Sequence, residues 1–243
     1  MGIDPFERER RFLLSRDQTL TFLGAVGSKC VQERYDRSRA LAFTRTTYLD
    51  TPDLSYFRSC AQGVARRLRV REYAVASTLQ EIPQLTGICC LELKQSTGSA
   101  RAKVRFSAAP HTLRRILAGE AQFDIDDDSP SQLMALSTLR AELAGRQVAP
   151  CLTTWYRRTC LTGEDGRVRI TLDQDLSFCQ PEALGDDGAA VARVVARGPE
   201  RILEVKFFGE EPAWLARATA PLTAAPSFSK FRMGMLALQR KAA

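Results

Sequence analysis

The sequence predicts an α+β protein in which an antiparallel β-sheet closes into a barrel and helices pack on its outside. Two patterns support this prediction: several strand-length segments alternate charged with apolar residues, and the segments between them begin with residues typical of helix starts. With 243 residues, 44% of them hydrophobic, the chain can bury one large core. We therefore expect a single domain over residues 6–243, with Met1–Pro5 as a disordered start or a cloning remnant.

The predicted strands present one charged face and one apolar face. In residues 64–73, Arg67, Arg69 and Arg71 share one face and apolar side chains share the other, because side chains alternate across a strand. The same alternation recurs in six other segments, which are Glu7–Leu13, Cys89–Lys94, Arg101–Phe106, Thr154–Cys160, Arg167–Asp173 and Leu203–Phe207. Their charged positions are rich in Arg and Lys and contain isolated glutamates.

These charged faces are unusual when taken together, although any one strand alone fits a polar face turned to water. If the sheet closes with its apolar side beneath the helices, the charged side chains line an enclosed lumen. A lumen rich in Arg and Lys requires a bound polyanion, since the cations would otherwise repel one another. The sequence therefore favours a tunnel that binds a polyanion.

Helices are predicted in six segments between and after the strands. Their start signals include Ser15 or Asp17 before the first and Ser129 before the fourth. The six segments are Thr19–Val26, Leu54–Cys60, Thr112–Leu117, Gln132–Leu143, Ala213–Ala218 and Ser229–Arg240. Glycine and aspartate in Glu182–Gly188 predict a loop, and we expect this stretch, continued to Gly198, to be the least ordered part.

The composition excludes several kinds of catalytic site. The one histidine, His111, follows Pro110 at a predicted helix start, which indicates a surface position, so nucleophile pairs that need an imidazole are excluded. The seven cysteines show no paired metal-binding spacing and are interpreted as reduced thiols. The chemistry must then depend on Arg, Lys, Glu, Asp and Tyr.

The net charge points to an anionic partner. A formal charge of +7 and a pI near 9.2 fit nucleic acid, a phosphate compound or an acidic membrane surface. No apolar run reaches the length of about 18 residues needed to span a membrane, and residues 1–12 are too charged for a signal peptide. We therefore expect a soluble cytoplasmic protein.

Eight short motifs follow one another in a distinctive order. They are Glu9-Arg10-Arg11-Phe12-Leu13-Leu14, Thr47-Tyr48-Leu49-Asp50-Thr51-Pro52, Arg69-Val70-Arg71-Glu72-Tyr73, Leu91-Glu92-Leu93-Lys94, Tyr156-Arg157-Arg158-Thr159, Arg169-Ile170-Thr171-Leu172-Asp173, Leu203-Glu204-Val205-Lys206 and Phe228-Ser229-Lys230-Phe231. In their order and spacing the chain resembles the VTC (vacuolar transporter chaperone) domain, the polyphosphate polymerase branch of the triphosphate tunnel metalloenzyme (CYTH-like) superfamily. The resemblance covers nearly the whole chain.

The resemblance implies a closed antiparallel tunnel of eight strands in which cations hold phosphates and carboxylates hold Mn²⁺ or Mg²⁺. It also implies a metal-dependent polyphosphate polymerase, which transfers the γ-phosphate of ATP onto a growing inorganic polyphosphate chain. Phosphoryl transfer needs positioning and charge stabilisation rather than a covalent nucleophile, which suits a chain with a single histidine.

The resemblance further assigns roles to individual residues. Catalytic roles fall to Arg69, Arg71, Lys94, Arg158 and Lys230. Phosphate binding falls to Arg11, Lys103, Tyr156, Ser229, Arg169 and Lys206, and metal binding falls to Glu204, Glu9 and Glu92, with Glu7 as a supporting carboxylate. These residue types suit the task, because Arg binds phosphate oxygens in pairs, Lys acts as a point charge and carboxylates bind hard divalent cations.

Two departures from the polymerase pattern leave other functions open. Ser227 stands where the pattern has a lysine, so the chain could be a polyphosphate-binding sensor without activity. Residues 7–11, Glu-Arg-Glu-Arg-Arg, come close to the Glu-x-Glu-x-Lys of tunnel triphosphatases, with Arg11 in place of the lysine. The main alternative is therefore a tunnel triphosphatase that hydrolyses tripolyphosphate or a nucleoside or thiamine triphosphate.

A nucleic-acid-binding module is less favoured. Such modules interleave exposed aromatic residues with basic ones, whereas Phe106 and Phe207 lie in the apolar register and only Tyr73 departs from it. The expected partners are ATP and inorganic polyphosphate or triphosphate, without DNA or RNA and without a membrane segment in this chain. The sequence does not indicate an oligomeric state.

Overall fold

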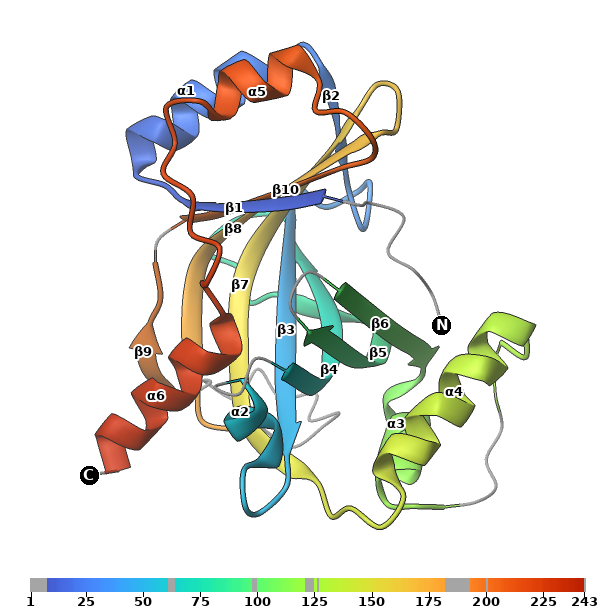
Figure 1. Cartoon of the computed structure of the whole chain (residues 1–243). Helices are drawn as coiled ribbons and strands as arrows, with labels where there is room; N and C mark the ends of the chain where they lie inside the picture. The colour runs from blue at the N-terminus through green and yellow to red at the C-terminus, as the bar shows by residue number, and fades with distance from the viewer. Residues whose placement is uncertain are drawn as a thin grey trace.

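The computed structural model describes residues 8–60, 64–97, 100–120, 125, 127–181, 193–199 and 201–242. A strongly curved sheet dominates this part of the chain, and helices lie at its edges and ends (Figure 1). The expectations for Met1–Pro5, for Glu7 and for the loop Glu182–Gly188 fall outside the described residues.

A single ten-stranded antiparallel sheet forms the scaffold of the described residues. Its strands are β1 (Arg8–Leu13), β2 (Cys30–Glu33), β3 (Leu41–Asp50), β4 (Val64–Ala76), β5 (Gln84–Thr97), β6 (Ala100–Ala108), β7 (Ala149–Gly163), β8 (Val168–Cys179), β9 (Val194–Arg197) and β10 (Arg201–Phe207). They follow the order β1-β10-β8-β7-β3-β4-β5-β6, with β2 added to β7 and β9 added to β8. Three strands lack the alternation of charged and apolar residues by which the sequence predicts a strand. β2 and β9 have four residues each, and β3 carries threonines in place of most charges.

The predicted closed barrel of eight strands is wrong, because the sheet is an open half-barrel. β1 and β6 form its two edges, and no backbone ladder joins them in the part of the chain that the structure describes. The edges meet instead through a side-chain ion pair, with Arg101 Nη1 2.6 Å from Glu9 Oε2. Alternation decides which face a residue occupies, but it does not decide whether two distant edges pair. The α+β class and the antiparallel pairing are confirmed.

Helices cover both ends of the outer face. They are α1 (Arg16–Val26), α2 (Ser55–Ser59), α3 (Pro110–Leu117), α4 (Pro130–Leu143), α5 (Ala213–Thr219) and α6 (Lys230–Ala242). α1 begins with a capping box, in which Ser15 Oγ accepts a hydrogen bond from Gln18 N and Gln18 Oε1 accepts one from Ser15 N. α1 and α5 lie side by side over β1, β8 and β10, whereas α3 and α4 pack against β5 and β6 (Figure 1).

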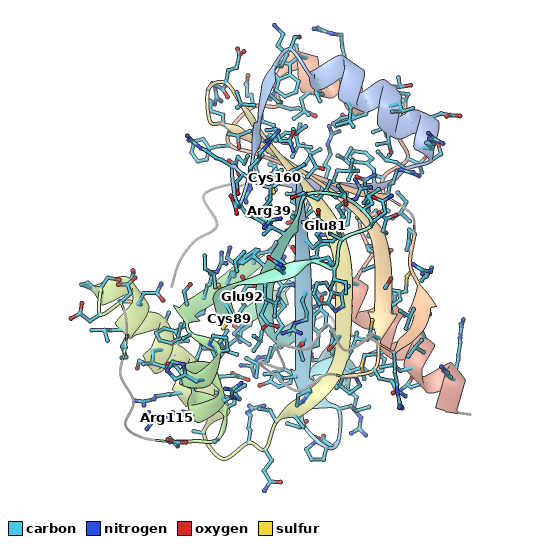
Figure 2. The ribbon with its side chains drawn as sticks, turned by 180° about the vertical axis from the view of Figure 1, so that it is seen from behind. Arg39, Glu81, Cys89, Glu92, Arg115 and Cys160 are labelled. Atoms are coloured by element: carbon cyan, nitrogen blue, oxygen red, sulfur yellow. The ribbon has the colours of Figure 1, made fainter. Side chains whose placement is uncertain are left out.

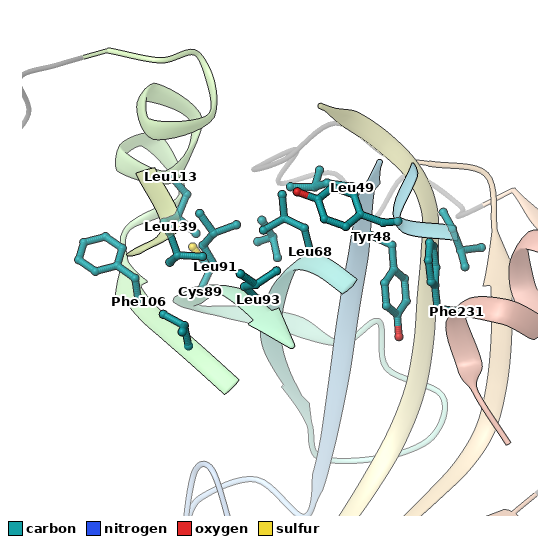
Figure 3. Close-up of a cluster of buried hydrophobic side chains, with 14 of the residues drawn as sticks. Tyr48, Leu49, Leu68, Cys89, Leu91, Leu93, Phe106, Leu113, Leu139 and Phe231 are labelled. Atoms are coloured by element: carbon teal, nitrogen blue, oxygen red, sulfur yellow. The ribbon is translucent and has the colours of Figure 1, made fainter. Parts of the chain in front are cut away.

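The apolar strand faces are buried in two cores. One lies beneath α1 and α5 and contains Phe12 and Phe22. The other lies beneath α3 and α4 and contains Leu91, Phe106 and Leu139, each almost fully buried (Figure 3). Burial of these apolar side chains is the main stabilising contribution. Because side chains alternate along a strand, the charged residues of the same strands then face the concave side.

α6 departs from the prediction that the helices pack outside. Phe231 stacks on Tyr48 with ring centroids 4.7 Å apart (Figure 3), and Tyr48 pairs with Leu152 on the concave face of the sheet. A Cβ at Gly234 would lie 2.5 Å from Leu152 Cδ2, so the close approach of α6 requires glycine. α6 therefore fills one end of the half-barrel and brings Lys230 to its interior.

Several smaller expectations can be compared with the structure. His111 is exposed in the first turn of α3, as the sequence predicts. All seven cysteines are free thiols. Within the described residues, every helix is too short or too polar to traverse a lipid bilayer.

Candidate functional site

The concave side of the half-barrel contains a cavity of about 200 Å³. Its wall consists of inward-facing strand side chains and of the residues around the start of α6. Apart from Glu7, which lies outside the described residues, the fourteen residues to which the sequence assigns a role all line this one cavity, namely Glu9, Arg11, Arg69, Arg71, Glu92, Lys94, Lys103, Tyr156, Arg158, Arg169, Glu204, Lys206, Ser229 and Lys230. Strand alternation places most of these residues on the concave face, and the start of α6 adds Ser229 and Lys230.

The cavity is strongly cationic. Of the described residues that line it, twelve are Arg or Lys and three are Glu. Such a concentration of like charge in a partly dry space is unfavourable unless counter-charge is present. The protein supplies part of that counter-charge through three separate carboxylate clusters, which differ in how completely they are neutralised.

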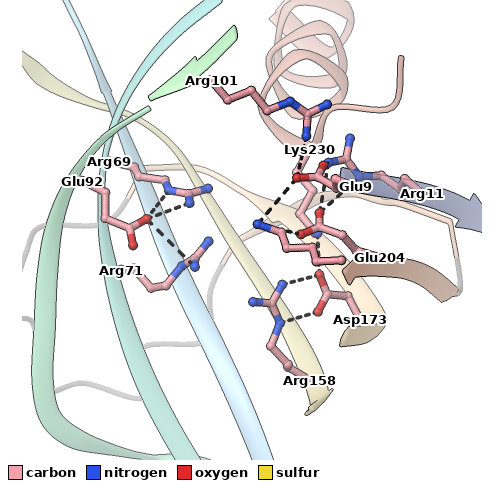
Figure 4. A network of polar contacts seen from close by, with 11 residues as sticks. Glu9, Arg11, Arg69, Arg71, Glu92, Arg101, Arg158, Asp173, Glu204 and Lys230 are labelled. Carbon is pink, nitrogen blue, oxygen red and sulfur yellow. Dashed lines mark hydrogen bonds and ion pairs between the residues drawn. The ribbon is translucent and has the colours of Figure 1, made fainter. Parts of the chain in front are cut away.

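The first cluster surrounds Glu92 on β5. Arg69 donates to Glu92 Oε2 from Nε at 2.8 Å, and Arg71 Nη1 lies 4.0 Å from Oε2 (Figure 4). Arg105 Nε lies 3.5 Å from Oε1. Only 1% of the Glu92 side chain is exposed. Burial opposes its ionisation, but Arg71, Arg69 and Arg105 outweigh that effect and hold the Glu92 pKa far below its usual range. Glu92 thus fixes three guanidiniums along one wall.

The second cluster joins two carboxylates, Glu9 on β1 and Glu204 on β10. Arg11 Nη2 lies 2.5 Å from Glu9 Oε1 and 3.0 Å from Glu204 Oε2. Lys206 Nζ lies 3.6 Å from Glu9 and 3.9 Å from Glu204. Burial raises the pKa of Glu204, but Arg11, Lys206 and Lys94 lower it by more, so the pKa lies well below its usual range. Both carboxylates share the same two cations.

The third cluster is centred on the buried carboxylate of Asp173 on β8. Arg158 donates to its two oxygens from Nε at 2.6 Å and from Nη2 at 2.7 Å, and Lys230 Nζ donates at 2.6 Å (Figure 4). Both cations also lie over the ring of Tyr156, at 5.1 and 4.7 Å from its centroid.

The hydroxyl of Tyr156 lies in the field of these cations. Burial raises its pKa, but Arg158 and Arg71 outweigh burial and lower the pKa below the ordinary value for tyrosine. A phenol with a lowered pKa is a stronger hydrogen-bond donor to an anion. The arrangement therefore suits donation from Tyr156 to an oxyanion in the cavity.

Arg67 lines the cavity and is missing from the residues with an assigned role, although strand alternation places it beside Arg69 and Arg71. It forms no hydrogen bond or ion pair with any residue that the structure describes. The buried Nε atoms of Arg67 and Arg71 also have no acceptor among those residues. Buried N–H donors of this kind are costly unless a ligand accepts from them.

Two further lining residues, Tyr35 and Tyr73, form an edge-to-face pair with centroids 4.9 Å apart. Tyr73 continues the inward register of β4, so alternation could have identified it. Tyr35 lies in the loop after β2, where no periodic pattern applies, and the sequence gives no signal for its position.

The described residues offer only a few possible ligands for a divalent metal. No group of three His, Cys, Asp or Glu side chains that could hold a metal occurs among the described residues. Mg²⁺ and Mn²⁺ in phosphate-binding sites are, however, commonly held by one or two carboxylates together with substrate oxygens. Glu9 and Glu204 provide such a pair. Glu92 is less accessible, since 1% of its side chain is exposed against 27% for Glu204.

The chain was compared with known families and structures. The VTC domain family model matches residues 6–239, whereas no curated protein sequence matches the chain significantly. A crystal structure of a Bacillus halodurans protein, provisionally assigned as an adenylate cyclase, is similar with a TM-score of 0.51 and 15% identity, covering 93% of this chain and 95% of that one. A Pyrococcus horikoshii protein has a TM-score of 0.47 and 13% identity, covering 96% and 98%. At these identities the structural likeness concerns the fold alone.

Proposed function

The chain belongs to the VTC domain family, and on this basis we propose that it is a metal-dependent polyphosphate polymerase. It transfers the γ-phosphate of ATP onto the end of an inorganic polyphosphate chain. One observation carries the proposal: the described lining of a single narrow cavity has twelve cations and three carboxylates. A linear chain of phosphates supplies closely spaced negative charge in a shape that such a cavity can admit.

The cations position two anionic reactants that would otherwise repel each other. Arg69, Arg71 and Arg158 present planar N–H groups to phosphate oxygens, while Lys94 and Lys230 contribute point charges. Held in line, a terminal oxygen of the polyphosphate attacks the γ-phosphorus of ATP. A new P–O bond forms, the bond to the β-phosphate oxygen breaks, and ADP leaves with the electron pair.

Each carboxylate cluster has a separate role in this proposal. Glu92 and Asp173 hold the arginines in position and do not bind metal, because guanidinium or ammonium groups already occupy their oxygens. Glu204, whose Oε1 lies 3.9 Å from Lys206 Nζ, would hold Mn²⁺ or Mg²⁺ together with substrate oxygens. Glu9 would join it when a bound phosphate draws Arg11 and Arg101 away, because these two guanidiniums lie 2.5 and 2.6 Å from its oxygens. When bound, the metal would supply a positive charge next to the transferring phosphoryl oxygens.

A triphosphatase is the second candidate, and the position of Glu9 favours it. Glu9 belongs to the first-strand motif that is typical of tunnel hydrolases, and it shares two cations with Glu204. In this alternative the same cations hold a triphosphate, and water takes the place of the polyphosphate end as the attacking group.

One assay separates the candidates. The protein is incubated with ATP and Mn²⁺ or Mg²⁺, and the products are analysed for long phosphate polymer on a gel and for free phosphate by colorimetry. Polymer with ADP supports the polymerase. Free phosphate without polymer identifies a triphosphatase, and tripolyphosphate binding without either product identifies a sensor. Absence of binding to ATP, tripolyphosphate and polyphosphate would overturn all three.

A further inference from the structure

A second basic surface lies outside the cavity, on the loop of residues 34–40 between β2 and β3. Two of its arginines, Arg34 and Arg37, are exposed and make no hydrogen bond, ion pair or ring contact with the residues that the structure describes. We call these two residues the loop arginines. The third, Arg39, is held by Ser77 and by Glu81 in the loop after β4 (Figure 2).

This surface shares lining residues with the cavity. A small outer hollow is lined by the loop, by part of β7, and by Tyr35 and Arg158, which also line the cavity. A shallower hollow shares Arg34 with the first and adds Arg37. A series of shared residues therefore leads from the phosphate-binding wall to the loop arginines.

The charges along this path are mainly positive. Its carboxylates are Glu33, which lies 4.0 Å from Arg169 of the cavity, and Asp36, which accepts two hydrogen bonds within its own loop. Arg157, also on the path, lies 3.2 Å from Asp175. The existing carboxylates thus have partners elsewhere, and the loop arginines are available to an external anion.

We propose that the loop arginines bind the part of a long polyphosphate chain that extends beyond the cavity, so that the protein holds long chains more tightly than tripolyphosphate. This inference rests on the proposed function, since it extends the same ligand along the same wall. A single unbranched phosphate chain fits this arrangement, because it carries negative charge at every phosphate and can run from the cavity wall onto the exposed arginines. Nucleic acid also carries phosphates and is the competing ligand.

The test uses the double variant Arg34→Gln with Arg37→Gln. Its control is Arg217→Gln with Arg240→Gln, which removes the same charge from exposed positions on α5 and α6 outside the cavity. Calorimetry or fluorescence anisotropy gives the Kd of each protein for tripolyphosphate and for long-chain polyphosphate at several salt concentrations. For the loop variant we expect about tenfold weaker binding of the long chain and a salt dependence reduced by about one to two in log–log slope. Its tripolyphosphate Kd stays unchanged.

Other outcomes are equally informative. If both ligands weaken together, or if the control variant weakens long-chain binding as much, the loop arginines provide only general attraction and the inference is wrong. If single-stranded RNA loses affinity in the loop variant while long polyphosphate does not, the surface binds nucleic acid instead. If the wild-type protein binds neither phosphate ligand, the proposed function itself fails, which is a distinct result.

Discussion

Two walls of the same cavity use glutamate in opposite ways. On β4, β5 and β6 a single buried carboxylate, Glu92, faces three guanidiniums. On β1 and β10 two carboxylates, Glu9 and Glu204, share one guanidinium and one ammonium, and 27% of the Glu204 side chain is exposed. Cations outnumber Glu92 three to one, whereas Glu9 and Glu204 together face only three cations once Arg101 is included, and Glu204 keeps part of its side chain near the solvent.

This difference shows that an inward-facing position on a strand does not by itself determine the role of a carboxylate. All three glutamates face inward from strands with similar sequence patterns. The number and type of cations around each one decide whether its oxygens are saturated. We therefore expect substitutions at Glu92 to affect stability first and substitutions at Glu204 to affect catalysis first.

The largest expected effect follows Glu204→Gln. The amide keeps the shape of the side chain but removes the charge that a divalent metal needs, so kcat for ATP-dependent turnover should fall by about 10²–10³-fold. The Mn²⁺ or Mg²⁺ concentration for half-maximal activity should rise, and chelation should abolish wild-type activity. Glu211→Gln is the matched control, because Glu211 pairs with Arg10 outside the cavity. Unchanged metal dependence in the Glu204 variant would remove Glu204 from the metal site.

Glu92→Gln should give the reverse pattern. Without the carboxylate, Arg69, Arg71 and Arg105 keep their charges in a buried space, and breaking such a cluster costs about 3–5 kcal/mol of unfolding free energy. Urea unfolding measures this loss, and saturating tripolyphosphate should recover part of it by supplying counter-charge. The metal dependence of any remaining activity should match that of the wild type. Normal stability together with an altered metal requirement would reverse the roles assigned to the two walls.

The sequence predicts which residues line the cavity better than it predicts the shape of the sheet around it. Side-chain parity is a local property of a strand, so the positions of Arg69, Lys94 and Arg158 follow from alternation alone. Closure of the barrel depends on two edges that lie far apart along the chain, and local patterning holds no information about their pairing. The sequence therefore predicts the inward face correctly and the closed barrel incorrectly.

The partners within the cavity could not be predicted either. The three arginines around Glu92 come from β4 and β6, and their distances depend on the registers of these strands against β5, which include an irregularity between Glu72 and Ala74 of β4. The position of α6 depends on Gly234, whose close contact becomes visible only in three dimensions. Tyr35 reaches the cavity from a loop, where no repeat relates sequence to direction.

Lys94 lies between the two walls and gives a smaller, pH-dependent prediction. Burial lowers its pKa to about 8, although Glu9 and Glu204 partly oppose the shift. A bound phosphate stabilises the charged form, so binding takes up a proton once the free protein has lost it. Affinity for tripolyphosphate without divalent metal should therefore be constant below about pH 7 and weaken by about tenfold toward pH 9.

The sign for stability is the opposite of the usual lysine case. Because the folded-state pKa lies below the unfolded value, the folded protein carries a stability cost at pH below 8, and that cost diminishes as the pH rises toward 10.5. Lys94→Arg is the control, since arginine stays charged throughout this range. It should bind tripolyphosphate without the step above pH 7. If the step persists in the arginine variant, another group causes it.

The smallest effect is expected at the ion pair between the sheet edges, where Arg101 meets Glu9. Arg101 is about half exposed, with 47% of its side chain accessible, so its pair with Glu9 is screened by solvent and contributes at most about 1 kcal/mol. Arg101→Gln should leave the melting temperature nearly unchanged and weaken tripolyphosphate binding by no more than a few-fold, with the difference vanishing at high salt. Thermal melts and binding titrations at low and high salt measure both quantities. A loss as large as that of Glu92→Gln would mean that this one contact holds the half-barrel together, and that β1 and the β6 edge depend on each other far more than an exposed ion pair allows.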